Sequence, residues 1–352
     1  MTIRNGLAAG HWTGHHLHYH GEQDLLLASL LIPILHRWFA AGSLERFFFV
    51  RYALGGPHIR LRCRWRDTNA EGRFQDELTR VATRFFERHP SASSWSPDTI
   101  RQRNRGILAH DPSEVDDVVY PDHYVRQVIF EPETDRYGGE ALVAASLEVF
   151  CLSSLAVCDA LASAEFSPKE SKYALQVLAA QAVASVEDTL DFSRLMESLG
   201  ERARRRFPAA LDQADERFAQ TGRAFSRGLY GQLRGPASDA VDRLQAGLRL
   251  LRRQLGEVGD SASTVLMSQL HMTANRLGLS NLREVYLLRL LECAAGQWLE
   301  EDLALPPTSG QPSAGAPDSL AELVNGGLDR FASSGDSSTL QPVDSRAQRR
   351  GP

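Results

Sequence analysis

Two segments with alternating side chains, joined by a glycine-rich turn, constrain the fold of this chain most strongly. Residues 46–53 (RFFFVRYA) are rich in aromatic and β-branched residues, which favours a buried strand. Gly55, Gly56 and Pro57 then predict a turn. Residues 58–65 (HIRLRCRW) alternate, so one strand face carries Ile59, Leu61, Cys63 and Trp65, and the other carries His58, Arg60, Arg62 and Arg64. The pattern predicts a mostly antiparallel sheet.

The cationic face of residues 58–65 allows two interpretations. It fits the solvated edge of a sheet, where charged side chains are common. It also fits a cationic wall that binds carboxylates or a peptide backbone, because guanidinium groups bind carboxylates in a bidentate way. Arg51, on the neighbouring predicted strand, would add to this wall.

The remaining segments complete an α+β pattern. Residues 16–20 and 124–130 predict further strands, residues 24–41 predict a helix with a kink at Pro33, and residues 91–120 predict a long loop with some local order. From Glu140 onward the pattern is mainly helical, and the predicted helices cover residues 140–164, 170–199, 208–220, 237–258, 262–277 and 282–300. We expect a mostly antiparallel N-terminal sheet packed with a largely helical C-terminal half.

The same pattern predicts the domain organisation. Residues 1–304 are expected to form a single α+β domain, with a sheet-rich part at 12–139 and a helical part at 140–304. Residues 305–352 are poor in apolar side chains, which predicts a mostly disordered tail. Residues 319–331 are expected to form one short helix within that tail.

Composition narrows the function classes. The 352 residues have a net charge of −5, which argues against direct binding of nucleic acid. The four cysteines form no C-x-x-C pair, which argues against a disulfide framework or a zinc site. No signal peptide is visible, and the apolar stretch 25–34 is too short to span a bilayer. We therefore expect a cytoplasmic protein with no membrane contact.

Residues 130–139 (FEPETDRYGG) are a candidate functional loop. They follow a predicted strand, a position where loops often carry function. Glu133, Arg136 and the pair Gly138-Gly139 fit a positioned ion pair, and they also fit a surface turn.

His271 is the candidate for proton chemistry. It lies four residues before Asn275, so both share a face of the predicted helix. One interpretation is an interior histidine near a helix end capped by Gly278. The other is a general acid or base, because the ordinary pKa of histidine is near neutral.

His16, His18 and His20 suggest a metal site at first sight, because alternate residues of a strand share a face. No cysteine or carboxylate stands near them at ligand spacing, so we expect no metal. The chain also lacks the phosphate-binding loop, the dinucleotide-binding glycine pattern and the nucleophile elbow, so we expect no cofactor.

Taken in order, these segments resemble a known family, the thiopeptide-type bacteriocin biosynthesis domain, over residues 12–299. This domain is the C-terminal part of full-length lantibiotic dehydratases and also occurs alone in thiopeptide pathways. The segments that carry the resemblance are residues 18–21 (HYHG), 48–52 (FFVRY), 55–62 (GGPHIRLR), 131–133 (EPE), 136–139 (RYGG), His271 and 275–277 (NRL). Residues 91–122 find no clear counterpart in the family.

The resemblance implies an enzyme that acts on a ribosomally made precursor peptide. In the family, a glutamylation domain esterifies serine or threonine with glutamate, and the elimination domain removes the glutamate to leave a dehydroamino acid. This chain is too short for both domains, so a separate glutamylating subunit is expected, and a homodimer is left open. A second branch of the fold joins two dehydroalanines in a formal [4+2] cycloaddition, as a pyridine synthase. A non-catalytic peptide-binding role is the third alternative.

The family's elimination residues match His271, Arg62 and Arg136. Elimination needs a base, stabilisation of a developing enolate and a grip on the departing carboxylate, whereas a cycloaddition of neutral alkenes needs fewer charges. Elimination is therefore the favoured interpretation. The residues expected to bind substrate or support the site are Arg51, Arg60, Glu133, Asn275 and Arg276.

Overall fold

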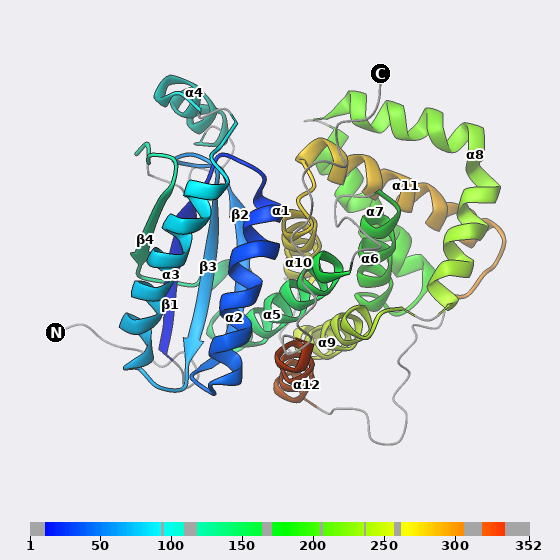
Figure 1. Cartoon of the computed structure of the whole chain (residues 1–352). Coiled ribbons are helices and arrows are strands. Elements are labelled where there is room, and N and C mark those ends of the chain that lie inside the picture. Colours follow the sequence, from blue (N-terminus) through cyan, green and yellow to red (C-terminus); the bar gives the residue numbers. More distant parts are fainter. Residues whose placement is uncertain are drawn as a thin grey trace.

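A four-stranded antiparallel sheet forms the N-terminal part of the molecule (Figure 1). The computed structural model describes residues 11–92, 95–108, 118–163, 171–204, 207–235, 237–256, 262–305 and 319–334. The strands are β1 (His11–His18), β2 (Leu44–Tyr52), β3 (His58–Trp65) and β4 (Tyr124–Val128), in the order β2-β3-β1-β4. All three pairings are antiparallel, which confirms the predicted α+β class.

The register decides which side chains share a face, because directly paired residues point to the same side. One face, which we call the polar face, contains three rows of paired residues: Phe48, Arg62, Gly14, Val128; then Val50, Arg60, His16, Arg126; then Tyr52, His58, His18, Tyr124. β3 lies between β2 and β1, and Arg62 is only 8% exposed. The solvated-edge interpretation of residues 58–65 is therefore wrong.

The opposite face of the sheet is apolar, and helices cover it. Leu17, Phe49, Ile59 and Leu61 lie there and are fully buried. The covering helices are α1 (Gln23–Leu26), α2 (Ile32–Ala40) and α3 (Ala70–Arg88), with a π-helical turn over Leu27–Leu31 between the first two. Pro33 follows that turn at the start of α2, where its missing N–H costs little, so the predicted kink takes the form of a π-helical insertion.

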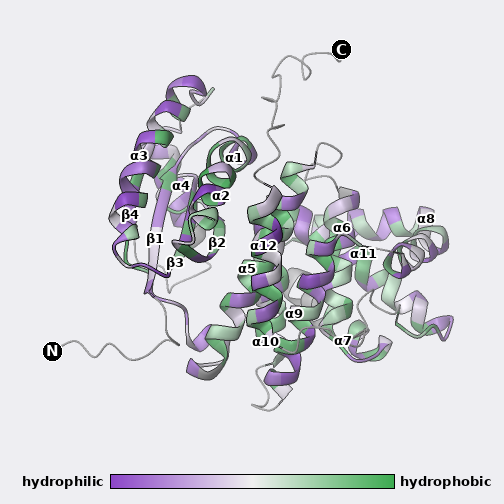
Figure 2. Cartoon of the chain, turned by 60° about the horizontal axis from the view of Figure 1, so that its bottom comes forward, coloured by the Kyte–Doolittle hydropathy of each residue, from purple (hydrophilic) through white to green (hydrophobic). Residues whose placement is uncertain are grey.

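The helical part begins with α5 (Glu140–Ala162) and continues through α6 (Ser171–Ala184), α7 (Thr189–Arg204), α8 (Pro208–Arg234), α9 (Asp239–Gly256), α10 (Ala262–Arg276) and α11 (Asn281–Glu300). α5 and α10 both contact β2, which joins the two parts. In Figure 2, purple residues dominate α3 on the outside of the sheet, whereas green, hydrophobic residues are prominent on α5. Residues Leu142–Ala162 are long and apolar enough to cross a membrane, but 78% of their apolar window is buried inside the protein, as in a core helix.

Several predicted elements differ from the structure. The strand expected at 16–20 is β1, which runs from His11 to His18. The helix expected at 170–199 is two helices, because the chain turns at 185–188 and the Asp188 carboxylate accepts a hydrogen bond from the Asp191 N–H, in the manner of an N-cap. The helix expected at 208–220 extends to Arg234. The region expected to be mainly loop contains α4 (Pro97–Leu108).

The short helix expected at 319–331 is α12 (Leu320–Ser334), which packs against α2, α5 and α9. Its Phe331 ring contacts His36 and Phe47, so α12 reaches the edge of the sheet. Residues 306–318 and 335–352 of the predicted disordered tail lie outside the described residues. The division into a domain at 1–304 and a tail at 305–352 stays a prediction.

Candidate active site

A cavity of about 540 Å³ lies where the polar face of the sheet meets the helical part. Its lining residues come from β2, β3, the segment after β4, α5 and α10: Phe48, Val50, Tyr52, Arg60, Arg62, Ile129, Phe130, Glu131, Pro132, Glu133, Arg136, Tyr137, Leu147, Phe150, His271, Met272 and Asn275. Six of the eight predicted site residues are therefore brought to one cavity. The two that are not are Arg51 and Arg276.

Arg62 and Arg60 enter the cavity from β3. The Arg62 guanidinium donates to the Leu61 carbonyl at 3.3 Å and contacts the Phe130 ring. Burial, reinforced by the nearby Arg60 charge, lowers the pKa of Arg62 to about 9. The Arg60 guanidinium lies 3.3 Å from the centre of the Tyr52 ring, a close cation–π contact. The Arg62 guanidinium therefore remains charged at neutral pH.

Arg136 enters from the short 3-10 helix η2 (Asp135–Tyr137) that precedes α5. Its guanidinium forms an ion pair with Glu133 at 3.0 Å and contacts the Ser268 hydroxyl of α10 at 3.4 Å. Gly138 follows with φ of 85°, and a Cβ there would meet the Leu142 side chain at 2.7 Å. Only glycine fits this turn without strain, so the Gly138 position fixes how the Arg136 loop enters α5.

His271 presents its imidazole to the cavity from α10. Its Nδ1 lies 3.0 Å from both carboxylate oxygens of Glu284, which is on α11 and only 8% exposed. This contact orients the ring, so that Nε2 lies on the side of the ring away from Glu284. Sequence reasoning missed Glu284. A signal existed, because Gly278 separates two predicted helices, and His271 and Glu284 stand seven residues before and six residues after it.

Asn275 fastens α10 to the sheet. Its side-chain oxygen accepts from the Arg51 N–H at 2.9 Å, and its amide donates to the Arg51 carbonyl at 2.8 Å. Both ends of the amide are thus used, so Asn275 lines the cavity but serves to hold the helix that carries His271.

Arg51 and Arg276 lie outside the cavity lining. Arg51 pairs with Ile59, so its side chain points to the apolar face and forms an ion pair with Asp24 at 2.5 Å. Arg276 is fully buried behind the cavity wall, with its guanidinium 4.4 Å from the Phe150 ring centre. Its three guanidinium nitrogens have no hydrogen-bond acceptor within the described ranges, and burial lowers its pKa to about 9. Arg276 therefore adds positive charge behind the wall without contacting a substrate.

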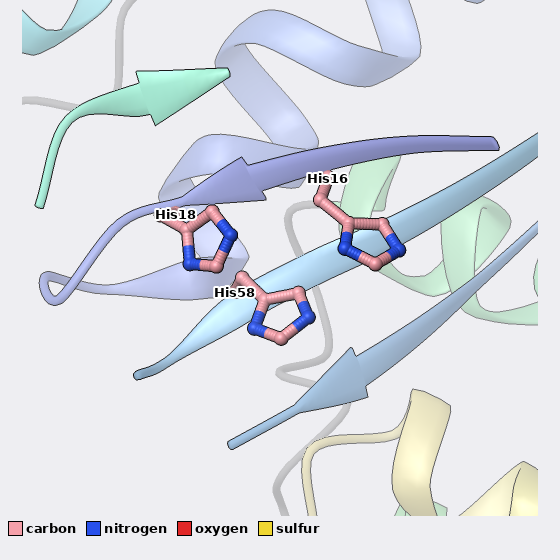
Figure 3. A group of neighbouring side chains, drawn as sticks. All are labelled: His16, His18 and His58. Atoms are coloured by element: carbon pink, nitrogen blue, oxygen red, sulfur yellow. The ribbon is translucent and has the colours of Figure 1, made fainter. Parts of the chain in front are cut away.

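Three histidines cluster on the polar face next to the cavity (Figure 3). One ring nitrogen of each of His16, His18 and His58 lies within 4.8 Å of the others, a spacing that could hold a metal ion. His58 replaces the expected His20, which lies beyond the end of β1. Guanidinium nitrogens of Arg62 and Arg60 lie 3.3 and 3.2 Å from nitrogens of His16 and His58. A metal cation there would face these charges, so the arrangement disfavours one.

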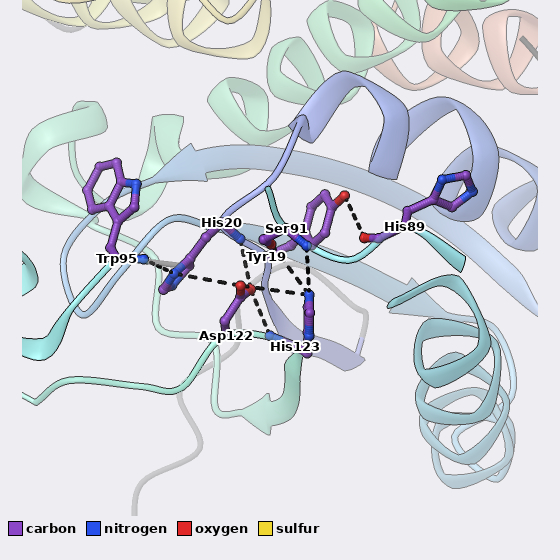
Figure 4. A network of polar contacts seen from close by, with 7 residues as sticks. All are labelled: Tyr19, His20, His89, Ser91, Trp95, Asp122 and His123. Atoms are coloured by element: carbon purple, nitrogen blue, oxygen red, sulfur yellow. Dashed lines mark hydrogen bonds and ion pairs between the residues drawn. The ribbon is translucent and has the colours of Figure 1, made fainter. Parts of the chain in front are cut away.

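A polar network beside this cluster holds the segment that leads into β4 (Figure 4). The Asp122 carboxylate accepts from the backbone N–H groups of His20 and His123, each at 2.9 Å. The Ser91 hydroxyl and the Asp122 carboxylate approach the same nitrogen of His123, Nε2, at 3.4 and 3.7 Å. In a serine–histidine–aspartate triad, the serine and the aspartate contact opposite nitrogens of the histidine ring. This network therefore has a structural role and is not a nucleophilic site.

The cavity thus combines one imidazole held by a carboxylate with several guanidiniums. Such a set can remove a proton next to a carbonyl, stabilise the negative charge that develops and bind an anionic leaving group. The guanidiniums of Arg60 and Arg62 come from the sheet, and His271 comes from the helical part.

Comparison with known proteins gives one family match and several structural neighbours. A family model described as the C-terminal domain of lantibiotic biosynthesis dehydratases matches residues 12–295. No curated protein sequence matches the chain. The pyridine synthase TbtD, from thiomuracin biosynthesis, superposes with a TM-score of 0.67 at 20% identity, over 81% of this chain and 98% of that one.

Two further solved structures share the fold. The tRNA-dependent lantibiotic dehydratase MibB from Microbispora sp. 107891 gives a TM-score of 0.58 at 22% identity, over 86% of this chain and 29% of that one. TsrL gives a TM-score of 0.53 at 15% identity, over 90% of this chain and 98% of that one. At these identities the likenesses establish the fold alone.

Proposed function

The chain belongs to the family of lantibiotic biosynthesis dehydratase C-terminal domains, and from this premise we propose that it eliminates glutamate from glutamylated serine or threonine in a precursor peptide. The observation that carries the proposal is the meeting of His271 with Arg62 and Arg136 around one cavity. The His271–Glu284 contact supports it, because a positioned carboxylate stabilises the imidazolium that forms when a histidine accepts a proton.

The proposed reaction breaks two bonds and forms one π bond. His271 Nε2 takes the α-proton of the glutamylated residue, and the electron pair forms the Cα–Cβ double bond. The Cβ–O bond breaks, and glutamate leaves as a carboxylate. Arg62 and Arg136 hold the glutamyl carboxylates and stabilise the negative charge that develops on the adjacent carbonyl oxygen. Glu133 orients Arg136 through their ion pair at 3.0 Å.

The chain is proposed to depend on a partner. Elimination starts from a glutamylated peptide, and no motif for nucleotide binding or glutamate activation is visible in the sequence. A separate glutamylating subunit would therefore supply the substrate. Incubation with an unmodified precursor peptide, with no other enzyme present, should leave the mass of the peptide unchanged. Dehydration of that bare peptide would contradict this dependence.

A pyridine synthase activity is the second candidate, and one observation favours it. The chain spans 98% of the pyridine synthase TbtD but only 29% of the dehydratase MibB. In such a reaction His271 and the guanidiniums would protonate and orient the amide that enters the ring. The charge of the cavity favours elimination, because two neutral alkenes gain little from several guanidiniums.

Mass spectrometry of the cognate peptide separates these candidates. Loss of glutamate from a glutamylated peptide supports elimination. Ring formation with release of the leader from an already dehydrated peptide supports the pyridine synthase. If neither peptide changes, the result counts against both enzymatic candidates and favours a binding subunit of the modification complex.

A further inference from the structure

The arginines of β2 and β3 have two kinds of partner. Three of them are paired with carboxylates, and these ion pairs are Arg46–Glu148, Arg51–Asp24 and Arg64–Glu45, at 2.9, 2.5 and 3.0 Å. Arg62 lies on the same strand as Arg64, yet no carboxylate pairs with it within the described residues. Its partners are the Leu61 carbonyl and the Nε2 atom of His16, each at 3.3 Å. Among the described residues, this nearly buried guanidinium thus has neutral partners only.

His16 is held in its neutral form by its surroundings. Nη2 of Arg62 lies on its Nε2 side at 3.3 Å, and Nη2 of Arg126 lies 3.5 Å from its Nδ1. A protonated ring would face a guanidinium at each nitrogen. Burial, followed by the charges of Arg62, His58, Arg60 and Arg126, lowers the pKa of His16 far below its ordinary value.

Gly14 leaves room for the Arg62 side chain. The two residues are paired across β1 and β3, and a Cβ at Gly14 would lie 2.8 Å from Nη1 of Arg62. The same Cβ would lie 2.6 Å from the Val128 side chain. Because Gly14 has no side chain, the Arg62 guanidinium can lie over β1. There it reaches His16, which is two residues further along the same face of β1.

We propose that His16 is a positioning residue that orients Arg62 as a neutral hydrogen-bond acceptor, so that a carboxylate of the substrate becomes the counterion of Arg62. A carboxylate at this position would orient the guanidinium equally well, but it would also neutralise the guanidinium charge. An imidazole orients it and leaves its charge available. This inference rests on the proposed function for the identity of the anion, a glutamyl carboxylate.

The test is the binding of glutarate, a dicarboxylate, to the full chain by calorimetry at pH 7. Wild type should bind glutarate, and His16→Gln, which keeps a neutral acceptor, should bind within about threefold of it. His16→Glu should weaken binding by about 10- to 100-fold, because an internal carboxylate then competes for Arg62.

The matched control is His18→Glu, which adds the same charge two residues further along the polar face and should change binding less than His16→Glu does. Three results would each overturn the inference: no binding by wild type, normal binding by His16→Glu, or equal losses in His16→Gln and His16→Glu.

A second measurement reads the charge of His16 in wild type and needs one folded variant for the assignment only. In wild type labelled with ¹⁵N-histidine, the ring signals that disappear in His16→Gln, or in His16→Ala if the glutamine variant fails to fold, belong to His16. They should report a neutral ring at pH 5.5, where an ordinary histidine is mostly protonated. A protonated ring would overturn the inference. If glutarate binds as expected but glutamylated peptide is not converted, the proposed function fails and the role of His16 stands.

Discussion

His16 in the sheet and His271 in the helical part have opposite electrostatic partners. His16, on β1, lies between the guanidiniums of Arg62 and Arg126. His271, on α10, lies against the carboxylate of Glu284. A ring between cations stays neutral, and a ring beside a carboxylate can accept a proton and hold it. Under the proposed function, the helical part transfers the proton and the sheet binds the anion.

The largest expected effect is the loss of His271. His271→Ala should reduce glutamate elimination by about 100- to 10,000-fold, because removal of a general acid or base typically costs that much. Glutamylated peptide should accumulate, since glutamylation occurs elsewhere, and mass spectrometry detects it. A near-normal elimination rate would show that His271 does not transfer the proton, and it would favour the pyridine synthase candidate.

Loss of a cation should produce the same phenotype with a somewhat smaller effect. Arg62→Ala and Arg136→Ala should each slow elimination by about 100- to 1,000-fold, as for other groups that stabilise developing charge. Arg62→Lys should not restore the rate, because an ammonium lacks the bidentate fork of guanidinium.

Arg64→Ala is the control for the sheet. The Arg64 side chain lies on the same face as Arg62 but forms ion pairs with Glu45 and Glu148. The substitution should leave elimination closer to normal while lowering thermal stability. An equal loss of activity in Arg64→Ala and Arg62→Ala would show that the strand as a whole, and not the Arg62 charge, matters.

The Glu284 carboxylate should have a smaller effect on rate than His271 itself. Glu284→Gln keeps the size of the side chain but removes the charge that stabilises the imidazolium, so kcat should fall by about 10- to 100-fold. The acidic limb of the rate profile should move to lower pH, because a neutral amide no longer favours the protonated ring. An unchanged pH profile would mean that Glu284 only packs against α10.

Much of the fold could be predicted because strand alternation is a local signal. The period of two in residues 58–65 identified both the strand and its polar face. The orientation of Arg51 could not be predicted in this way, since it depends on the pairing of Arg51 with Ile59, a contact between strands. The order β2-β3-β1-β4 likewise arises from contacts distant in sequence, and it is what buries Arg62.

The candidate site was partly predictable for the same reason. Motif positions located Arg62, Arg136 and His271, and the structure brings them to one cavity. The partners of these residues were missed because they are distant in sequence. Glu284 contacts His271 between two helices, and His16 contacts Arg62 between two neighbouring strands. A sequence pattern identifies which side chains are chemically capable, and tertiary contacts decide the charge state in which each one works.

The smallest expected effect concerns stability at low pH, and it tests the neutral histidines of the sheet. Burial lowers the pKa of His15 to about 4 and that of His18 to about 3, against about 6.5 in the unfolded chain. As pH falls below 6.5, the unfolded chain binds protons that the folded chain cannot, so the free energy of unfolding decreases by about 1.4 kcal/mol per pH unit for each such histidine. His18→Gln should reduce this slope by about that amount between pH 6 and pH 4, measured by urea unfolding. Above pH 8 the rings are neutral in both states, so the slope of the variant should equal that of wild type there. An unchanged slope at acidic pH would show that His18 is protonated in the folded protein, contrary to its place among the guanidiniums of the polar face.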